Sequence, residues 1–158
     1  EVGHFSEDPG VVTLEDYDLW LKLSRVCSFH FIHEVLGLYN YHAEGASTKV
    51  ELHLTNLLAI IAKHARHSPS GEQPGFKRAI RRRYAEGYYG AARQYHRAGV
   101  FKRAFAHYTH TIHIDPFLSR TYAALTLLLV DSMLGQSRRR GVLRAIRPGS
   151  WLASWLIA

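Results

Sequence analysis

The residues best suited to chemistry in this sequence are two adjacent acids, Glu15 and Asp16, at the start of an amphipathic run. Leu19, Trp20 and Leu23 recur at the three- and four-residue spacing of one helix face, so the run predicts a helix with an apolar core face. A helix N-terminus stabilises an ionised carboxylate, and such a carboxylate can accept a proton as a general base. Glu15 and Asp16 are therefore candidates for an active-site acid pair.

The same residues also allow a purely structural interpretation. If Thr13 is the N-cap, Asp16 occupies the third helical position, where an acidic side chain often bonds back to the backbone and closes a capping box. On spacing alone, capping is the better interpretation of Asp16. Catalysis needs support from elsewhere in the sequence.

That support comes from a resemblance carried by separate segments. Residues 15–23 read Glu-Asp-Tyr-Asp-Leu-Trp-Leu-Lys-Leu and follow Gly-His-Phe-Ser-Glu at 3–7, while residues 36–47 read Leu-Gly-Leu-Tyr-Asn-Tyr-His-Ala-Glu-Gly-Ala-Ser. They resemble the C-terminal part of the catalytic domain of family 2 glycosyltransferases. There, Gly-x-Phe-Asp-Glu precedes Glu-Asp-Tyr-Asp-Leu-Trp-Leu-Arg-Leu, and Leu-x-x-Tyr-Arg-x-His-x-x-x-x-Ser follows. Motifs in this order are more specific than either alone, and the resemblance covers roughly residues 1–66.

The resemblance implies an α/β parent enzyme of GT-A fold. Such an enzyme transfers a sugar, with inversion, from a nucleotide-sugar donor to a glycan or lipid-linked acceptor. The matched Asp16 would be the general base that takes the proton of the acceptor hydroxyl, and Glu15 would help to hold the acceptor or the site. Other matched residues would lie near the acceptor or the donor: Tyr17, Asp18, Trp20 and Ser47.

The resemblance also implies a divalent metal. His42 matches the family histidine near the metal and the diphosphate, and imidazole with carboxylates suits Mn²⁺ or Mg²⁺. Asn40 stands where the family commonly has Arg. The nucleotide-binding βαβ units and the Asp-x-Asp motif, which would supply most of the metal ligands, precede this segment in the family. We therefore expect a fragment, truncated within its catalytic domain and inactive by itself.

Beyond the first helix, which we expect to end near Ser24, apolar runs at 27–32 and 35–41 predict short strands. Residues 48–66 carry the apolar stripe of an amphipathic helix, and a stretch rich in Ser, Pro and Gly then predicts a linker. The expected fold class is mostly α with a short β segment. The predicted parts are the end of a catalytic domain at 1–67, a linker at 68–76 and an all-α region at 77–158.

The all-α region fits the spacing of one tetratricopeptide repeat, with small residues where helices touch, aromatic residues beside them, Gly at the turn and Pro at the end. The matching positions are Tyr88, Ala92, Tyr95, Gly99, Phe101, Ala104, Tyr108 and Pro116. A single repeat does not bury its faces by itself, so we expect these helices to pack on the catalytic domain. A second class of function stays open: a helical-repeat module that binds proteins without catalysis.

The formal net charge of +7 comes largely from arginine-rich clusters at 77–83 and 138–147. No recognisable DNA- or RNA-binding motif accompanies them, so nucleic acid is not an expected partner. The second cluster precedes a tryptophan pair, as in an interfacial membrane anchor, although a helix whose tryptophans close the core is the slightly better interpretation of that pair. We expect a cytoplasmic protein with peripheral contact at the inner face of the membrane. The candidate contact residues are Arg138, Arg139, Arg140, Trp151 and Trp155.

Overall fold

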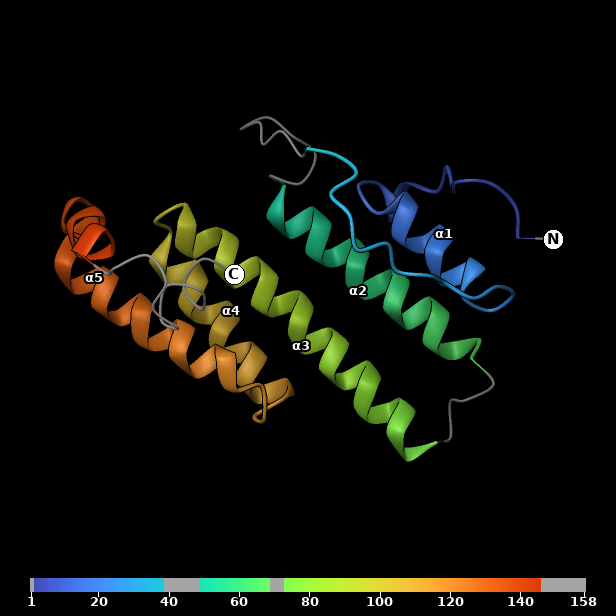
Figure 1. The fold of residues 1–158 in the computed structure, drawn as a ribbon. Coiled ribbons are helices and arrows are strands. Elements are labelled where there is room, and N and C mark those ends of the chain that lie inside the picture. Colours follow the sequence, from blue (N-terminus) through green and yellow to red (C-terminus); the bar gives the residue numbers. More distant parts are fainter. Residues whose placement is uncertain (1, 39–48, 69–72, 146–158) are drawn as a thin grey trace.

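The structure, a computed structural model, describes residues 2–38, 49–68 and 73–145, the last of these without side chains beyond Met133. Its elements in chain order are the 3₁₀ helix η1 (Pro9–Val11) and the helices α1 (Glu15–Leu23), α2 (Val50–Arg66), α3 (Pro74–Arg97), α4 (Phe101–Ile114) and α5 (Ser119–Ala145). These described residues contain no strand, so this part of the chain is all α (Figure 1). The predicted amphipathic helix at 48–66 is confirmed as α2.

Helix α3 holds the molecule together because it contributes to both hydrophobic cores. Figure 1 shows α1 and α2 beside its N-terminal half and α4 and α5 beside its C-terminal half. The N-terminal core consists of Val11, Leu14, Leu57, Ile60 and Ile61, with Ile80 and Tyr84 of α3 packed against it. The C-terminal core consists of Ala92, Tyr95, Ala104, Tyr108, Ala124 and Leu128.

The turn between α3 and α4 follows the sequence prediction. Gly99 has a φ of +75°, the left-handed conformation in which glycine carries no steric penalty. The backbone N–H of Val100 donates to the carbonyl of Tyr95 at 2.9 Å, which closes a Schellman motif at the end of α3. Ala92 and Ala104 are fully buried where the helices meet. The predicted small-residue contact is confirmed, while the assignment to the tetratricopeptide family stays a prediction.

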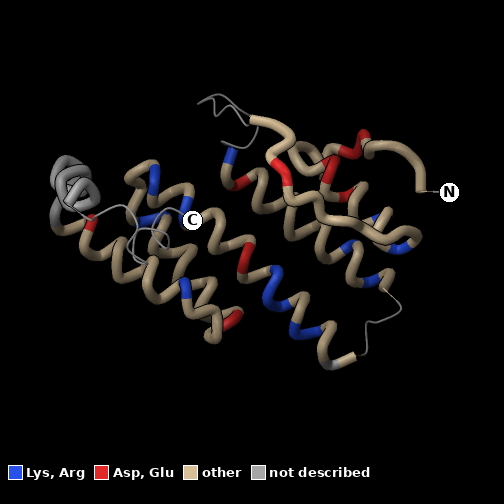
Figure 2. The backbone as a smooth tube through the Cα atoms, viewed as in Figure 1, with Lys and Arg blue, Asp and Glu red and all other residues tan. Residues whose placement is uncertain are grey.

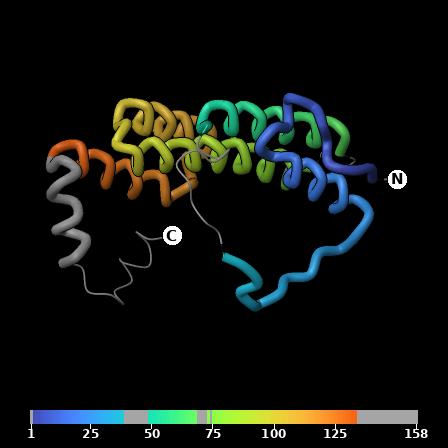
Figure 3. The backbone as a smooth tube through the Cα atoms, turned by 90° about the horizontal axis from the view of Figure 1, so that it is seen from above, coloured from blue at the N-terminus to red at the C-terminus, as the bar shows by residue number. Residues whose placement is uncertain are grey.

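Helices α2 and α3 lie antiparallel and approach closely. A Cβ atom built on Gly87 of α3 would lie 3.1 Å from Cδ2 of Leu57, so the glycine leaves room for the α2 side chain. Figure 3 shows α2 and α4 following one another on the same side of α3. Among the described residues, none of these helices combines the length and the apolar character needed to cross a bilayer.

The prediction of strands is wrong for the residues that the structure describes. Residues 27–38 contain no strand and project from the helices as a loop (Figure 3). Phe31 is 81% exposed and Leu38 is 92% exposed. A β-strand is stable only when it pairs with others and buries one face, and no other described segment offers this loop an edge. The end of the second predicted strand, 39–41, lies outside the described residues.

Candidate functional site

A strained turn leads into the acid pair. Thr13 has a φ of +76°, which is unusual for a β-branched residue. Its hydroxyl oxygen lies 3.1 Å from Nδ1 of His53 on α2. Asn56, also on α2, donates a 2.9 Å hydrogen bond from Nδ2 to the carbonyl oxygen of Val12. Helix α2 therefore clamps the turn, and strain that the surrounding structure enforces in this way is concentrated at functional sites.

The capping box considered for Thr13 and Asp16 does not form. The N-cap of α1 is Leu14, and no side chain caps this end of the helix. Glu15 folds back instead, because its Oε1 accepts a 3.1 Å hydrogen bond from the backbone N–H of Thr13. Glu15 thus supports the strained turn.

Asp16 is the acid of α1 that faces solvent. Its Oδ1 accepts a 2.7 Å hydrogen bond from the backbone N–H of Tyr17, while its Oδ2 has no hydrogen-bond partner in the part of the chain that the structure describes. Asp16 also lies within electrostatic reach of His53: burial lowers the pKa of His53, and the Asp16 charge opposes that shift. The geometry leaves one carboxylate oxygen of Asp16 available to accept a proton from a bound ligand.

Asp18 has the opposite environment, because its side chain is fully buried between α1 and α2. Lys22 Nζ lies 2.7 Å from Oδ2, while His64 Nε2 and Lys63 Nζ lie 2.8 Å and 3.5 Å from Oδ1. Burial raises the pKa of Asp18, but the hydrogen bonds from Lys22 and His64, together with the Lys63 charge, lower it to about 2. Asp18 therefore anchors α1 to α2, and its predicted nearness to donor or acceptor stays a prediction.

The aromatic residues of α1 differ from the predicted core face. Trp20 is 53% exposed, although its spacing placed it with Leu19 and Leu23 on the apolar face. Helix α1 instead packs through Tyr17 and Leu21, which contact the N-terminal core. The hydroxyl of Tyr17 accepts a 3.0 Å hydrogen bond from Nε of Arg83 on α3, and the guanidinium carbon lies 5.0 Å from the centroid of the Tyr17 ring.

The remaining predicted residues cannot be placed with these. His42, Ser47, Trp151 and Trp155 lie outside the described residues, and Arg138, Arg139 and Arg140 belong to α5 without described side chains. Within the described part of the chain, no group of three or more His, Cys, Asp or Glu side chains could hold a metal ion. These residues by themselves therefore do not form the predicted Mn²⁺ or Mg²⁺ site.

Sequence reasoning missed the polar side of α2. His53 and Asn56 hold the strained turn, and Lys63 and His64 hold Asp18. His53 and His64 are eleven positions apart, about three helical turns, so both lie on the side that faces α1. These polar residues recur at helical spacing beside the apolar stripe of α2, and this pattern in the sequence could have predicted a polar contact between α1 and α2.

The similarity to known proteins covers a third of the chain. Over 53 residues, 34% of this chain, the sequence is 42% identical to an uncharacterized glycosyltransferase of Rickettsia conorii. It is 40% identical over 53 residues to an uncharacterized glycosyltransferase of Rickettsia felis. The similarity links this chain to glycosyltransferases. The matched segment spans 8% of the length of each relative. No protein-family model and no solved structure matches the chain.

Proposed function

We propose that this chain is the C-terminal part of the catalytic domain of an inverting family 2 glycosyltransferase of GT-A fold, followed by a tetratricopeptide-like helical region. The complete enzyme transfers a sugar from a nucleotide-sugar donor to a glycan or lipid-linked acceptor. The partial similarity to proteins named glycosyltransferases supports the class of activity. The exposed carboxylate of Asp16, on a helix end that α2 holds, is the observation that carries the mechanism.

In this proposal Asp16 is the general base. The acceptor hydroxyl oxygen attacks the anomeric carbon of the donor sugar, and the bond from that carbon to the nucleotide diphosphate breaks. The hydroxyl proton passes to Oδ2 of Asp16, the oxygen without a partner among the described residues. Attack from the side opposite the departing diphosphate inverts the anomeric centre. Glu15 and the clamp from His53 and Asn56 keep the carboxylate in place.

The proposed metal and location depend on other parts of the protein. A divalent cation, Mn²⁺ or Mg²⁺, would supply positive charge to the departing diphosphate. Because the described residues do not form a metal site, its ligands are proposed to lie mainly outside them, with His42 among them. The proposed location is cytoplasmic, with peripheral membrane contact through Arg138–Arg140, Trp151 and Trp155.

The decisive variant is Asp16→Asn in the complete enzyme. Loss of a general base should lower kcat by two or more orders of magnitude, while nucleotide-sugar binding and the melting temperature stay close to those of the wild type, because the side chain is exposed. Single-turnover kinetics, donor binding by calorimetry and thermal melting measure the three quantities.

Asp18→Asn is the matched control, because it makes the same change two residues further along the helix. It should lower the melting temperature, and it should lower the turnover of the folded protein far less than Asp16→Asn does, because the buried Asp18 side chain holds α1 in place and does not face solvent. Near-normal turnover in Asp16→Asn, with or without a loss of stability, would remove Asp16 from catalysis.

A further inference from the structure

An apolar groove of about 680 Å³ runs along the N-terminal half of α3, between α2 and α4. Phe76, Ile80, Tyr84 and Tyr88 are spaced four residues apart and form one stripe of α3 in it, while Leu58 and Ile114 line its walls. Its volume falls in the range of about 300–1,000 Å³ typical of small-molecule sites, and its lining is mainly aliphatic and aromatic as in such sites. The groove is open to solvent and contains no residue of α1.

The same groove is also lined by positive charge. Arg66, Lys77 and Arg81 all contribute to it, and all have exposed side chains. None of these cations forms a salt bridge with an acid in the described part of the chain, whereas the nearby Arg82 and Arg83 both pair with Glu86. Figure 2 shows Lys and Arg gathered on the N-terminal half of α3. An apolar stripe and three cations without acidic partners therefore share one surface.

We propose that this groove binds a single-chain amphiphile with a phosphate headgroup, supplied by a membrane lipid. The hydrocarbon chain lies along the Phe76, Ile80 and Tyr84 stripe, where it removes apolar area from water. The phosphate meets Arg66, Lys77 and Arg81, because guanidinium groups pair with phosphate oxygens through bidentate hydrogen bonds. An apolar groove without cations would bind any hydrocarbon, and a cluster of cations without an apolar groove would bind any anion. The two features together therefore favour a ligand that has both a hydrocarbon chain and a phosphate. This site does not depend on the proposed transferase activity.

The test is a calorimetric titration of the 158-residue chain with decyl phosphate, at decyl phosphate concentrations below those at which it forms micelles. We expect saturable one-to-one binding that weakens as salt is added, because exposed charges are screened. The triple variant Arg66→Gln, Lys77→Gln, Arg81→Gln should bind at least tenfold more weakly. Ile114→Glu, which places a carboxylate in the apolar wall, should weaken binding to a similar degree, and thermal melting verifies that both variants fold.

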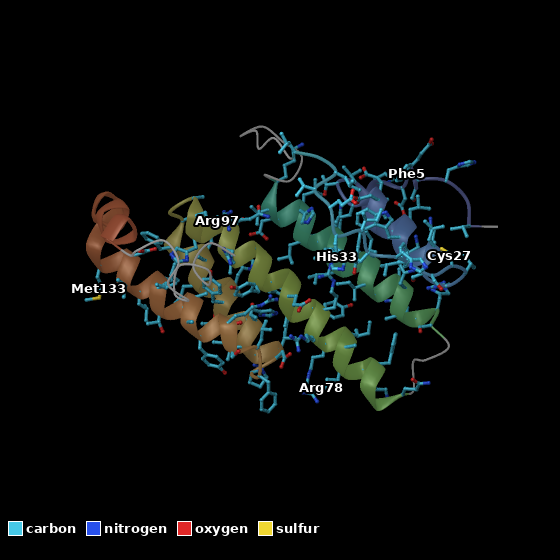
Figure 4. All side chains as sticks on the ribbon, viewed as in Figure 1. Phe5, Cys27, His33, Arg78, Arg97 and Met133 are labelled. Atoms are coloured by element: carbon cyan, nitrogen blue, oxygen red, sulfur yellow. The ribbon has the colours of Figure 1, made fainter. Side chains whose placement is uncertain are left out.

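A matched control removes the same charge elsewhere. Arg93→Gln, Arg97→Gln, Lys102→Gln changes three cations that do not line the groove, and Figure 4 shows Arg97 at the end of α3 opposite to Arg78. This control should bind decyl phosphate within twofold of the unchanged chain. Neutral decyl maltoside and inorganic phosphate should each bind at least tenfold more weakly than decyl phosphate. The proposal would be overturned if decyl phosphate did not bind, or if the control and the groove variants lost the same affinity for it. It would also be overturned if decyl maltoside or inorganic phosphate bound as tightly as decyl phosphate.

Discussion

Glu15, Asp16 and Asp18 all lie at the start of α1 but have different surroundings. Glu15 bonds to the preceding turn, Asp16 faces solvent and Asp18 is buried in an ion-pair network. The geometry of a helix explains the contrast between Asp16 and Asp18, since side chains two positions apart are rotated by about 200° around the helix axis and so point to nearly opposite sides. When Asp18 faces α2, Asp16 must face outward. The buried acid thus orients the exposed one.

The Asp18 network predicts a specific loss of stability in acid. The folded-state pKa of Asp18 is about 2 against a usual value of 3.8. A carboxyl with a lowered pKa stabilises the fold above its unfolded pKa, and this contribution, about 2 kcal/mol here, disappears as the pH falls from about 4 to 2. Asp18→Asn should therefore lower the free energy of unfolding by about 2 kcal/mol at pH 7 and flatten its decrease over that acid range.

Urea unfolding at a series of pH values measures both effects. Asp16→Asn serves as the control for removing one carboxylate from α1, because the Asp16 side chain is exposed and forms no salt bridge in the described part of the chain. An unchanged acid dependence in Asp18→Asn would mean that the network contributes little to stability.

At the scale of elements, the distance at which neighbouring side chains approach the α3 backbone differs between Gly87 and Gly90. At Gly87 the side chains of Leu57 and Leu54 on α2 come within 3.1 and 3.5 Å of where a Cβ would stand, whereas at Gly90 nothing lies within 4 Å. Both glycines weaken the helix itself, because glycine retains more backbone freedom in the unfolded chain than any other residue. At Gly87 this loss of helix stability is compensated by the close contact between α2 and α3 that the glycine permits.

This difference predicts opposite outcomes for substitutions three residues apart. Gly87→Leu should destabilise the protein by about 1–3 kcal/mol, since the added side chain overpacks the contact with Leu57. Gly90→Ala should stabilise it by about 0.5–1 kcal/mol through helix propensity. Denaturant unfolding measures both. Stabilisation by Gly87→Leu would show that α2 and α3 are not held in close contact at this point.

At the scale of the whole molecule, apolar surface is concentrated on the loop at 26–38. Val35 is 89% exposed, and Val26, Phe29, Phe31, Ile32, Leu36 and Leu38 are also exposed. Figure 3 shows this loop projecting away from the helices. Many exposed apolar side chains in one short segment are typical of a place where another polypeptide segment packs. The proposed transferase supplies such a segment in the remainder of its catalytic domain.

Hydrogen exchange tests this expectation. In the complete protein, amides of residues 26–38 should exchange at least tenfold more slowly than in the 158-residue chain, because burial and hydrogen bonding protect them. Residues 101–114 of α4 serve as an internal reference and should exchange at similar rates in both proteins. Equal exchange at 26–38 would count against a covering domain.

The sequence by itself determined the features that depend on local pattern. The apolar stripe of α2, the contact of Ala92 and Ala104 between helices and the turn at Gly99 were all predicted correctly. The position of Asp16 at the start of a helix was also predicted. These features follow from helical spacing and from backbone preferences that neighbouring residues set.

Only the tertiary structure decided which side of α1 is buried and what holds its acids. Thr13 meets His53 forty positions away, and Asp18 meets His64 forty-six positions away. Trp20 is exposed and Asp18 buried because α2 offers Asp18 the ammonium group of Lys63 and a close contact with the His64 ring on the side where α1 packs. Apolar runs at 27–38 resemble strands, but a strand needs an edge to pair with. Contacts between distant segments, which no local pattern encodes, decided these features.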